Sequence, residues 1–356
     1  MKTVNVAIVG CGVIAHEYAK DMVGVDFLTL RGAYDVDAER TKTFAEKHGG
    51  LAYDSLDDLL ADPEVDVVVN LTLFKAHHPI TKRALEAGKH VFSEKPLAGS
   101  VHEAVELVDV ARRHGVRLSC APVTFLGEAQ ERTRQEIRAG RVGKVRLVYA
   151  ESNHGLIEAW HPQPQSFYEV GPLRDVGVYP LGIVTNVLGP AARVSAYGTT
   201  LKKDRLTKRG VPFEAVEYDF YVAMVEFPGG EVLRLTCNFY APEQSRQKGV
   251  EFFGDDGQLH LGNWIAPSAA IEVAKYGEEY APLADYERTE RKWSWATGLV
   301  DLGSAILENR PSRMTGEHAA HIVEILEGAH ESIRTGRPVD LTTTFIPWAD
   351  RAPELV

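Results

Sequence analysis

The first third of the chain alternates short apolar runs with amphipathic stretches. Apolar runs of strand length occur at 4–9, 27–34, 65–71, 90–93 and 116–120. They are rich in β-branched residues, which suit strands buried on both faces. Helical patterns lie between them, at 14–22, 38–48, 56–61, 77–87 and 100–114. This alternation predicts a doubly wound parallel α/β sheet over residues 1–122.

The pattern changes after residue 122. A helical stretch at 127–139 precedes long alternating segments at 144–151, 192–200, 214–228, 230–240 and 247–254. Alternation of polar and apolar positions predicts antiparallel strands with one exposed face. Residues 123–356 are therefore predicted to form an α+β domain with a large, open-faced sheet. Because such a face commonly needs covering, we expect a subunit interface there.

A glycine-rich turn joins the first predicted strand to the first helix, with the sequence Gly10-Cys11-Gly12-Val13-Ile14-Ala15. A Gly-x-Gly-x-x-Ala turn in this position is typical of dinucleotide binding. Gly10 permits the tight turn, Gly12 lets the backbone approach a pyrophosphate, and Ala15 lets the helix pack closely on the strand. The N–H groups at the start of the helix attract phosphate oxygens.

An acidic residue at the end of the second strand bears on the choice of cofactor. Asp35 lies 25 residues after Gly10 and is expected to bind the adenosine ribose hydroxyls. Its carboxylate would repel a 2′-phosphate, and Asp37 adds a second negative charge. Arg40 is placed to stack on adenine, but one arginine does not outweigh two acids. The sequence therefore favours NAD over NADP.

Two further segments carry candidate proton-transfer chemistry. Glu94-Lys95-Pro96 follows a predicted strand, so Lys95 is expected at the strand edge where ligands bind. An oxidised nicotinamide would lower the pKa of a nearby lysine. Asp175 and Tyr179 are four residues apart and would share one face of a helix. A lysine, a phenol and a carboxylate can form a proton relay; the alternative is a surface lysine, a capping aspartate and a packed tyrosine.

These segments together resemble the glucose–fructose oxidoreductase, inositol dehydrogenase and MocA family of nicotinamide-dependent oxidoreductases. The resemblance lies in the glycine turn and in residues 87–98, 140–143 and 175–179, and it extends over nearly the whole chain. It implies a Rossmann domain and a sheet domain that binds substrate and pairs subunits as dimers or tetramers. It also implies that Lys95 is catalytic, that Asp175 binds substrate, and that Tyr179 shuttles the proton.

The resemblance implies further contacts with the cofactor and the substrate. The expected cofactor-binding residues are Gly10, Gly12, Val13, Ile14, Ala15, Asp35, Arg40, Thr72, His77, Glu94 and Lys95. The expected substrate-binding residues are Phe125, Trp160 and His161, for which packing in the core is the alternative. The chain reads Thr72-Leu73-Phe74 where the family usually has Thr-Pro-Asn. Substrate identity is therefore the property that transfers least.

Composition narrows the remaining possibilities. The chain has 356 residues and a net charge of −11, which argues against nucleic acid and anionic membranes as partners. No apolar run approaches the ~18 residues of a membrane span, and because the first predicted strand begins at residue 4, no signal peptide is expected. Three scattered cysteines fit a reducing cytoplasm. His318 and His321 share a helix face without further ligands at matching spacing, so no metal site is expected.

The resulting hypothesis is an enzyme that transfers a hydride between NAD(H) and a hydroxyl or keto group of a sugar, cyclitol or sugar derivative. Lys95 and Tyr179 would relay the hydroxyl proton, and Asp175 would orient the substrate. A trans-dihydrodiol dehydrogenase and an aldose oxidoreductase that recycles a tightly held cofactor are alternatives with the same fold. A non-catalytic regulator that senses NAD is an alternative of another class, against which the intact Lys95, Asp175 and Tyr179 argue.

Overall fold

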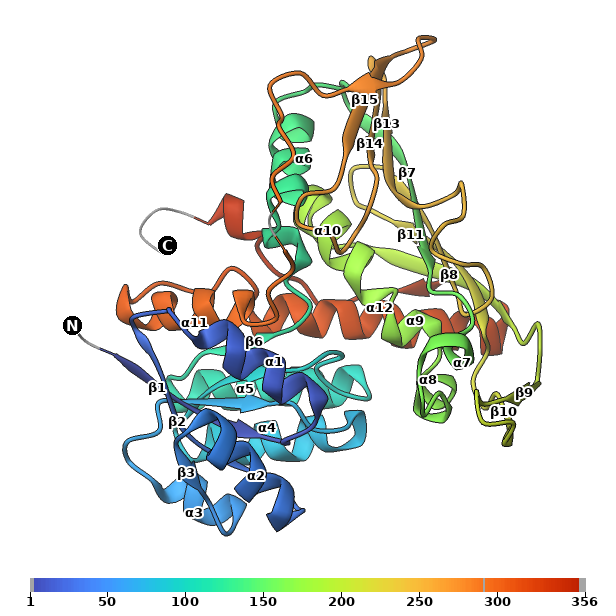
Figure 1. Cartoon of the computed structure of the whole chain (residues 1–356). Coiled ribbons are helices and arrows are strands. Elements are labelled where there is room, and N and C mark those ends of the chain that lie inside the picture. The colour runs from blue at the N-terminus through green and yellow to red at the C-terminus, as the bar shows by residue number, and fades with distance from the viewer. Residues whose placement is uncertain (1–2, 291, 352–356) are drawn as a thin grey trace. The chain divides into compact units, whose positions relative to one another are not determined.

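The computed structural model describes residues 3–290 and 292–351, which form two compact units (Figure 1). Unit 1 contains residues 3–123, 294–323 and 345–351, and unit 2 contains the segments 124–290, 292–293 and 324–344. The first segment of unit 1 ends close to the predicted boundary at residue 122. The later part of the chain does not form one continuous domain, because residues 294–323 pack with unit 1. The small residues Gly298 and Gly303 let this segment lie against Phe92 and Leu28.

Unit 1 is built on a six-stranded sheet, sheet A, in which every pairing is parallel. Its strands, in spatial order, are β3 (Leu51–Ala52), β2 (Leu28–Tyr34), β1 (Val4–Val9), β4 (Val67–Asn70), β5 (His90–Ser93) and β6 (Leu118–Cys120). The strand order reverses beside β1, which places the switch point of the sheet at the glycine turn. The predicted doubly wound fold is confirmed.

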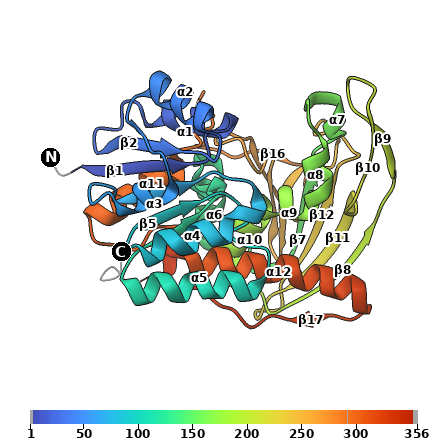
Figure 2. The same ribbon diagram turned by 90° about the horizontal axis from the view of Figure 1, so that it is seen from below.

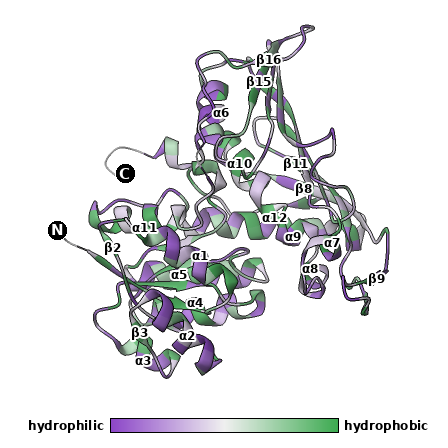
Figure 3. Ribbon diagram, in the orientation of Figure 1, coloured by the Kyte–Doolittle hydropathy of each residue, from purple (hydrophilic) through white to green (hydrophobic). Residues whose placement is uncertain are grey.

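The helices of unit 1 include three that begin at side-chain caps. The helices are α1 (Val13–Met22), α2 (Ala38–His48), α3 (Leu56–Ala61), α4 (His77–Glu86), α5 (Val101–His114), α11 (Thr297–Leu307) and the first part of α12 (Gly316–Thr335), with the short turns η1 (Phe74–Ala76) and η3 (Trp348–Asp350). Asp37, Ser55 and Ser100 accept backbone N–H bonds at the starts of α2, α3 and α5. Figure 2 shows α4 and α5 side by side. In Figure 3 the strands of sheet A are green and α2 is largely purple, as expected for a buried sheet and a surface helix.

Unit 2 contains a nine-stranded sheet, sheet B, that is antiparallel except where β7 pairs with β12. Its strands, in spatial order, are β16 (Ala281–Pro282), β15 (Ile271–Lys275), β14 (Gly257–Leu261), β13 (Gly249–Gly254), β7 (Val145–Asn153), β12 (Val232–Asn238), β11 (Phe220–Glu226), β8 (Arg193–Thr199) and β17 (Val339–Asp340). The strand predicted over 214–228 is shorter in the structure. Its first residue belongs to a separate hairpin of β9 (Asp204–Leu206) and β10 (Pro212–Glu214).

Sheet B has one buried and one partly exposed face. Inward residues such as Val148, Leu235 and Tyr221 are fully buried. The helices of unit 2 are α6 (Glu128–Arg138), α7 (Ile157–Trp160), α8 (Gln165–Val170), α9 (Pro172–Asp175), α10 (Val178–Leu188) and the second part of α12, with the turn η2 (Thr124–Leu126). Several of these, including α9 and α10, contact the sheet. The opposite face carries Met224 and Tyr197, both exposed.

Among the described residues, no helix is both long and apolar enough to span a membrane.

Candidate active site

The predicted cofactor-binding residues of unit 1 meet at the carboxyl edge of sheet A. The glycine turn follows β1, Asp35 follows β2, Thr72 follows β4, and Glu94 and Lys95 follow β5. Backbone bonds join these ends: Gly10 N donates to Tyr34 O at 2.8 Å, and Glu94 N donates to Asn70 O at 2.9 Å. This is the edge at which open parallel sheets bind their ligands.

The two glycines of the turn have different physical roles. Gly10 has φ +94°, and a Cβ on it would lie 2.9 Å from the backbone C and O of Leu71. Gly12 has φ −74°, and a Cβ there would meet nothing within 4 Å. No side chain caps α1 at Gly12, and its first turn holds no acid. The free N–H groups of α1 therefore border open space, which fits the pyrophosphate of a dinucleotide.

The remaining residues of the turn divide between surface and core. Val13 is 79% exposed and Ile14 is half-buried, whereas Ala15 is fully buried under the start of α1. Burial, aided by the Asp35 carboxylate, raises the pKa of the Cys11 thiol to about 12. Cys11 is therefore a small, protonated packing residue rather than a reactive thiolate.

Asp35 is held in place by backbone donors on both oxygens. Cys11 N donates to Oδ2 at 2.8 Å, and Asp37 N donates to Oδ1 at 2.9 Å. Each carboxylate oxygen retains a lone pair for a ribose hydroxyl. Asp37 caps α2 and pairs with the exposed Arg40 at 3.4 Å. Arg40 is thus partly neutralised, which leaves this end of β2 acidic.

His77 braces two loops at this edge. It is 2% exposed, with Nδ1 2.8 Å from Pro96 O and Nε2 3.0 Å from Thr72 O. Both ring nitrogens face backbone carbonyls. His77 would therefore contribute to cofactor binding by holding these two loops in position. Asn70, which the sequence analysis missed, accepts a bond from Thr72 Oγ1 at 2.7 Å. Its signal is a polar residue directly after three consecutive valines, near the end of a predicted strand.

Lys95 is half-buried at the end of β5. It follows Glu94, whose carboxylate accepts two hydrogen bonds. Glu94 accepts bonds from Tyr18 OH at 3.1 Å and from Lys95 N at 3.1 Å. Tyr18 is fully buried on α1 and was not anticipated from the sequence. The Lys95–Pro96 peptide bond is cis.

Asp175 and Tyr179 lie in unit 2, on two short helices rather than one. Asp175 ends α9 and Tyr179 lies in the first turn of α10, with Val176 and Gly177 between the helices. The prediction that they share one continuous helix face is wrong, because the chain makes a break at these two residues. Tyr179 is 8% exposed, and its ring centroid lies 5.0 Å from that of Trp264.

Trp264 is a neighbour that the sequence analysis missed. It lies in the loop after β14, and its Nε1 donates to Glu151 O at 3.1 Å. Nothing in the spacing of residues connects it to Tyr179, 85 positions earlier in the chain. The indole packs at a tilt of 41° against the phenol ring, which is buried.

A polar cluster anchors the helix that carries Asp175. Arg174 Nη1 lies 3.1 Å from His330 Nε2, and Tyr221 OH donates to Glu217 Oε2 at 2.8 Å. The hydrogen bond with His330 is the main cause that lowers the pKa of Glu217. His330 on α12 therefore links Arg174 of α9 to Glu217 and to Tyr221 on β11.

The predicted substrate residues of unit 2 have different environments. Trp160 is 47% exposed, and its ring contacts His154, His161 and Phe167 at centroid distances of 5.2, 5.5 and 5.8 Å. This aromatic surface is accessible to a ligand. Phe125 is 1% exposed, which fits the alternative role of packing in the core.

A buried ionic network holds the Trp160 segment. Arg205 donates to Glu158 Oε1 at 2.8 Å and to Tyr168 OH at 2.7 Å, and it also pairs with Asp219. The Arg205 side chain is fully buried, and the guanidinium lies 4.3 Å from the Tyr168 ring centroid. The β9–β10 hairpin is therefore locked onto α7 and α8.

The paired histidines of unit 1 are packed in the core. The His318 ring stacks on Phe345 at 3.9 Å with an interplanar angle of 7°, and His321 lies 5.5 Å from the same ring. Burial lowers the pKa of His318 well below its ordinary value. Within the described residues, no group of three or more His, Cys, Asp or Glu side chains is arranged to hold a metal ion.

Comparison with known proteins identifies both parts of the chain. Residues 4–121 match the family model described as "Oxidoreductase family, NAD-binding Rossmann fold", and residues 131–260 match the "GFO/IDH/MocA C-terminal domain". The chain is 24% identical over 351 residues to the uncharacterized oxidoreductase YrbE of Bacillus subtilis, covering 96% of this chain and 98% of YrbE.

Two further proteins illustrate the similarity. The dTDP-3,4-didehydro-2,6-dideoxy-α-D-glucose 3-reductase of Streptomyces violaceoruber is 31% identical over 232 residues, which cover 65% of this chain and 64% of the reductase. A solved levoglucosan dehydrogenase, in complex with NADH and L-sorbose, superimposes with a TM-score of 0.81. It shares 17% identity, and the match covers 96% of this chain and 99% of that protein.

Proposed function

The chain belongs to the GFO/IDH/MocA family of NAD-binding oxidoreductases, and on this basis we propose that it acts on a sugar, a cyclitol or a sugar derivative. In the proposed reaction, a hydride passes between NAD(H) and a hydroxyl or keto carbon. The observation that carries the proposal is the open glycine turn beside Asp35, with Lys95 at the same edge of sheet A, at the end of β5, two strands from β1.

Three side chains have roles in the proposed chemistry. Tyr179 exchanges a proton with the substrate hydroxyl, and the Lys95 ammonium favours the phenolate form. Asp175 accepts hydrogen bonds from substrate hydroxyls and so orients the ring. The bound nicotinamide supplies the hydride acceptor or donor. Burial of Tyr179 against Trp264 supports this role, because a shielded phenol exchanges its proton with substrate rather than with bulk water.

Two observations support a sugar-like substrate and NAD as cofactor. A relative 31% identical to this chain is named as a reductase of a nucleotide-linked keto sugar. The half-exposed Trp160 offers a flat aromatic face of the kind that packs on sugar rings. The acidic end of β2 supports NAD, since Asp35 and Asp37 would repel the 2′-phosphate of NADP.

The test combines a substrate panel with one substitution. Purified protein is assayed by nicotinamide absorbance with sugars, cyclitols and diols, and with the corresponding ketones in the reverse direction. Lys95→Ala should lower turnover by ~10²–10⁴, the range for positioned acid–base catalysis, while the Kd for NAD changes little. Lys82→Ala, which removes an ammonium paired with Glu106, is the matched control. Unchanged turnover in Lys95→Ala would refute the assignment.

The panel also separates the alternatives. Turnover with aromatic trans-diols only would favour a dihydrodiol dehydrogenase. Nicotinamide that copurifies and turns over without exchange would favour the self-recycling reaction. Tight NAD binding without turnover in either direction would favour a regulator.

We also propose that the chain forms a homodimer or homotetramer through the outer face of sheet B and resides in the cytoplasm. The exposed Tyr197 and Met224 on this face support the interface, and the unpaired thiols support the location. Light scattering of Tyr197→Arg and Met224→Arg should show a smaller mass than wild type. A monomeric wild type, or variants with unchanged mass, would contradict the interface.

A further inference from the structure

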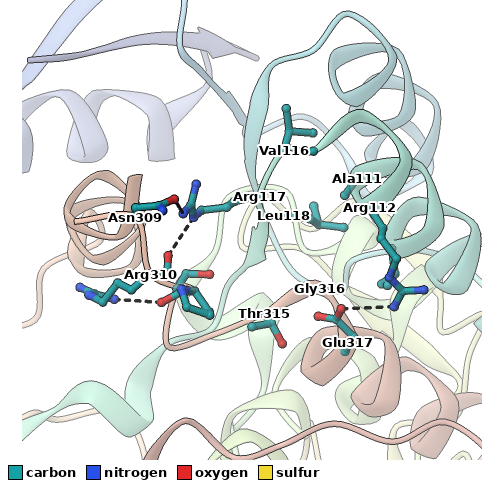
Figure 4. A pocket seen from close by; sticks show the side chains of 14 residues that line it. Ala111, Arg112, Val116, Arg117, Leu118, Asn309, Arg310, Thr315, Gly316 and Glu317 are labelled. Atoms are coloured by element: carbon teal, nitrogen blue, oxygen red, sulfur yellow. Dashed lines mark hydrogen bonds and ion pairs between the residues drawn. The ribbon is translucent and has the colours of Figure 1, made fainter. Parts of the chain in front are cut away.

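Unit 1 contains a second pocket, at the amino edge of sheet A. Its volume is about 390 Å³, within the ~300–1,000 Å³ range of small-molecule sites. The end of α5, the start of β6, the segment 309–312 and the start of α12 line it (Figure 4). Because all strands of sheet A are parallel, this edge lies opposite the glycine turn. The pocket is therefore not part of the cofactor site.

Arg117 supplies the charge on one side of the pocket. Its Nε donates to Arg310 O at 2.8 Å, and its Nη2 donates to Asn309 Oδ1 at 3.1 Å. In the described part of the chain, no carboxylate pairs with Arg117, whereas Arg310 pairs with Asp301 at 3.2 Å and Glu308 at 2.7 Å. Arginine carries five N–H donors, so the Arg117 guanidinium retains donors for a ligand.

Arg117 is also poorly solvated. It is half-buried, and burial together with the nearby Arg310 charge lowers the pKa of its guanidinium. An anion in the pocket would relieve this unfavourable environment, and bidentate pairing with an oxyanion suits a guanidinium.

Apart from the polar Asn309, Ser312 and Thr315, the rest of the lining is apolar or has its charges paired. Arg112 approaches from the other side and contacts Glu317 at 3.7 Å, so the one acidic side chain of the lining faces a cation. The wall between the two arginines is apolar and includes Val108, Val116 and Leu118. A ligand that fits this lining has an oxyanion at one end and a short apolar skeleton.

We infer that this pocket binds a small organic oxyanion, a carboxylate or a phosphate monoester. The oxyanion pairs with Arg117, and the carbon skeleton packs on Val116 and Leu118. The inference does not depend on the proposed reaction, because it involves none of the residues assigned to catalysis or to NAD.

Calorimetric titration in a chloride buffer free of oxyanions tests the inference directly. NAD is kept saturating so that the glycine turn is filled. The probes are phenyl phosphate, phenylacetate and the uncharged phenol. Saturable binding of at least one anion and not of phenol is expected, and the stronger of the two anions identifies the head group. Absence of saturable binding by either anion would overturn the inference.

Substitutions assign the binding to this pocket. Arg117→Gln should weaken it at least tenfold, but it also removes contacts that hold Asn309 and Arg310. Thr315→Asp avoids this difficulty. Thr315 lines the pocket, precedes α12, and its Oγ1 accepts a bond from His318 N at 3.4 Å. Aspartate is an equally good N-cap, so it should preserve the helix while placing a negative charge in the pocket.

The expected outcome is loss of anion binding in Thr315→Asp with an unchanged melting temperature. Thr315→Ser keeps the hydroxyl cap and should bind the anion as wild type does. Wild-type affinity in Thr315→Asp would overturn the inference, because the anion would then bind elsewhere.

Discussion

Replacing Gly12 by alanine separates cofactor binding from folding. A Cβ at Gly12 meets no atom within 4 Å, and its φ of −74° is accessible to alanine. Loss of the glycine N-cap costs up to ~1 kcal/mol, and lower entropy of the unfolded chain offsets ~0.4–1 kcal/mol of this. Stability should therefore hardly change. The added methyl group, however, occupies the space into which a pyrophosphate must fit.

The cost to NAD binding follows from overpacking. A methyl group forced into a close contact costs ~1–3 kcal/mol, which corresponds to a ~5- to 150-fold increase in Kd. Titration calorimetry with NAD measures this change, and circular dichroism measures the melting temperature. Wild-type affinity for NAD in Gly12→Ala would refute the assignment of this turn to the pyrophosphate.

Gly10→Ala and Gly24→Ala are the comparison variants, which separate the loss of stability from the loss of NAD binding. At Gly10 the positive φ costs ~1–3 kcal/mol, and a Cβ 2.9 Å from the Leu71 backbone adds a clash of a further ~1–3 kcal/mol. This variant should lose both stability and NAD binding. Gly24 has φ +89° with nothing within 4 Å of its Cβ, so Gly24→Ala should lose stability alone. A Gly10→Ala protein as stable as wild type would contradict the packing argument.

Three further predictions concern pH, a buried charge and a thiol. Burial lowers the pKa of His90 to about 4, so below pH ~6.5 the unfolded chain protonates this imidazole whereas the folded chain does not. The free energy of unfolding, measured with urea, should therefore fall by ~3 kcal/mol as the pH drops toward 4. Arg205→Met leaves Glu158 and Asp219 without their cation and should lower the free energy of unfolding by ~3–5 kcal/mol. Cys11, with its pKa raised to about 12, should react with iodoacetamide at neutral pH far more slowly than a free thiol.

Each of these predictions has a control. His90→Asn keeps an acceptor for Arg117 N, which now donates to His90 Nδ1 at 2.8 Å, and should lose most of the pH dependence; an unchanged dependence would assign it to other groups. Lys203→Met removes an exposed pair with Glu214 and should cost under ~1 kcal/mol; an equal loss in both variants would contradict the role of burial. Rapid alkylation of Cys11 would show that its thiol is accessible as a thiolate.

The sequence by itself determined most local elements of residues 3–123 and the family. Apolar runs of strand length, helix caps and glycine stops are local signals, so α2, α3, β1 and β5 coincide with their predicted ranges. The glycine turn was recognisable for the same reason, since its function depends on backbone conformation within six consecutive residues. Asp35 and Lys95 followed from their positions at the ends of predicted strands.

Only the tertiary structure decided the features that join distant segments. No periodic pattern in the chain marks these features. They are the contact of Trp264 with Tyr179, the hydrogen bonds by which His77 braces two loops, and the packing of residues 294–323 in unit 1. The break between Asp175 and Tyr179 was missed because a spacing of four residues is equally compatible with one helix or two. Burial and hydrogen bonding between segments depend on the packing of the whole unit, and local propensity does not encode that packing.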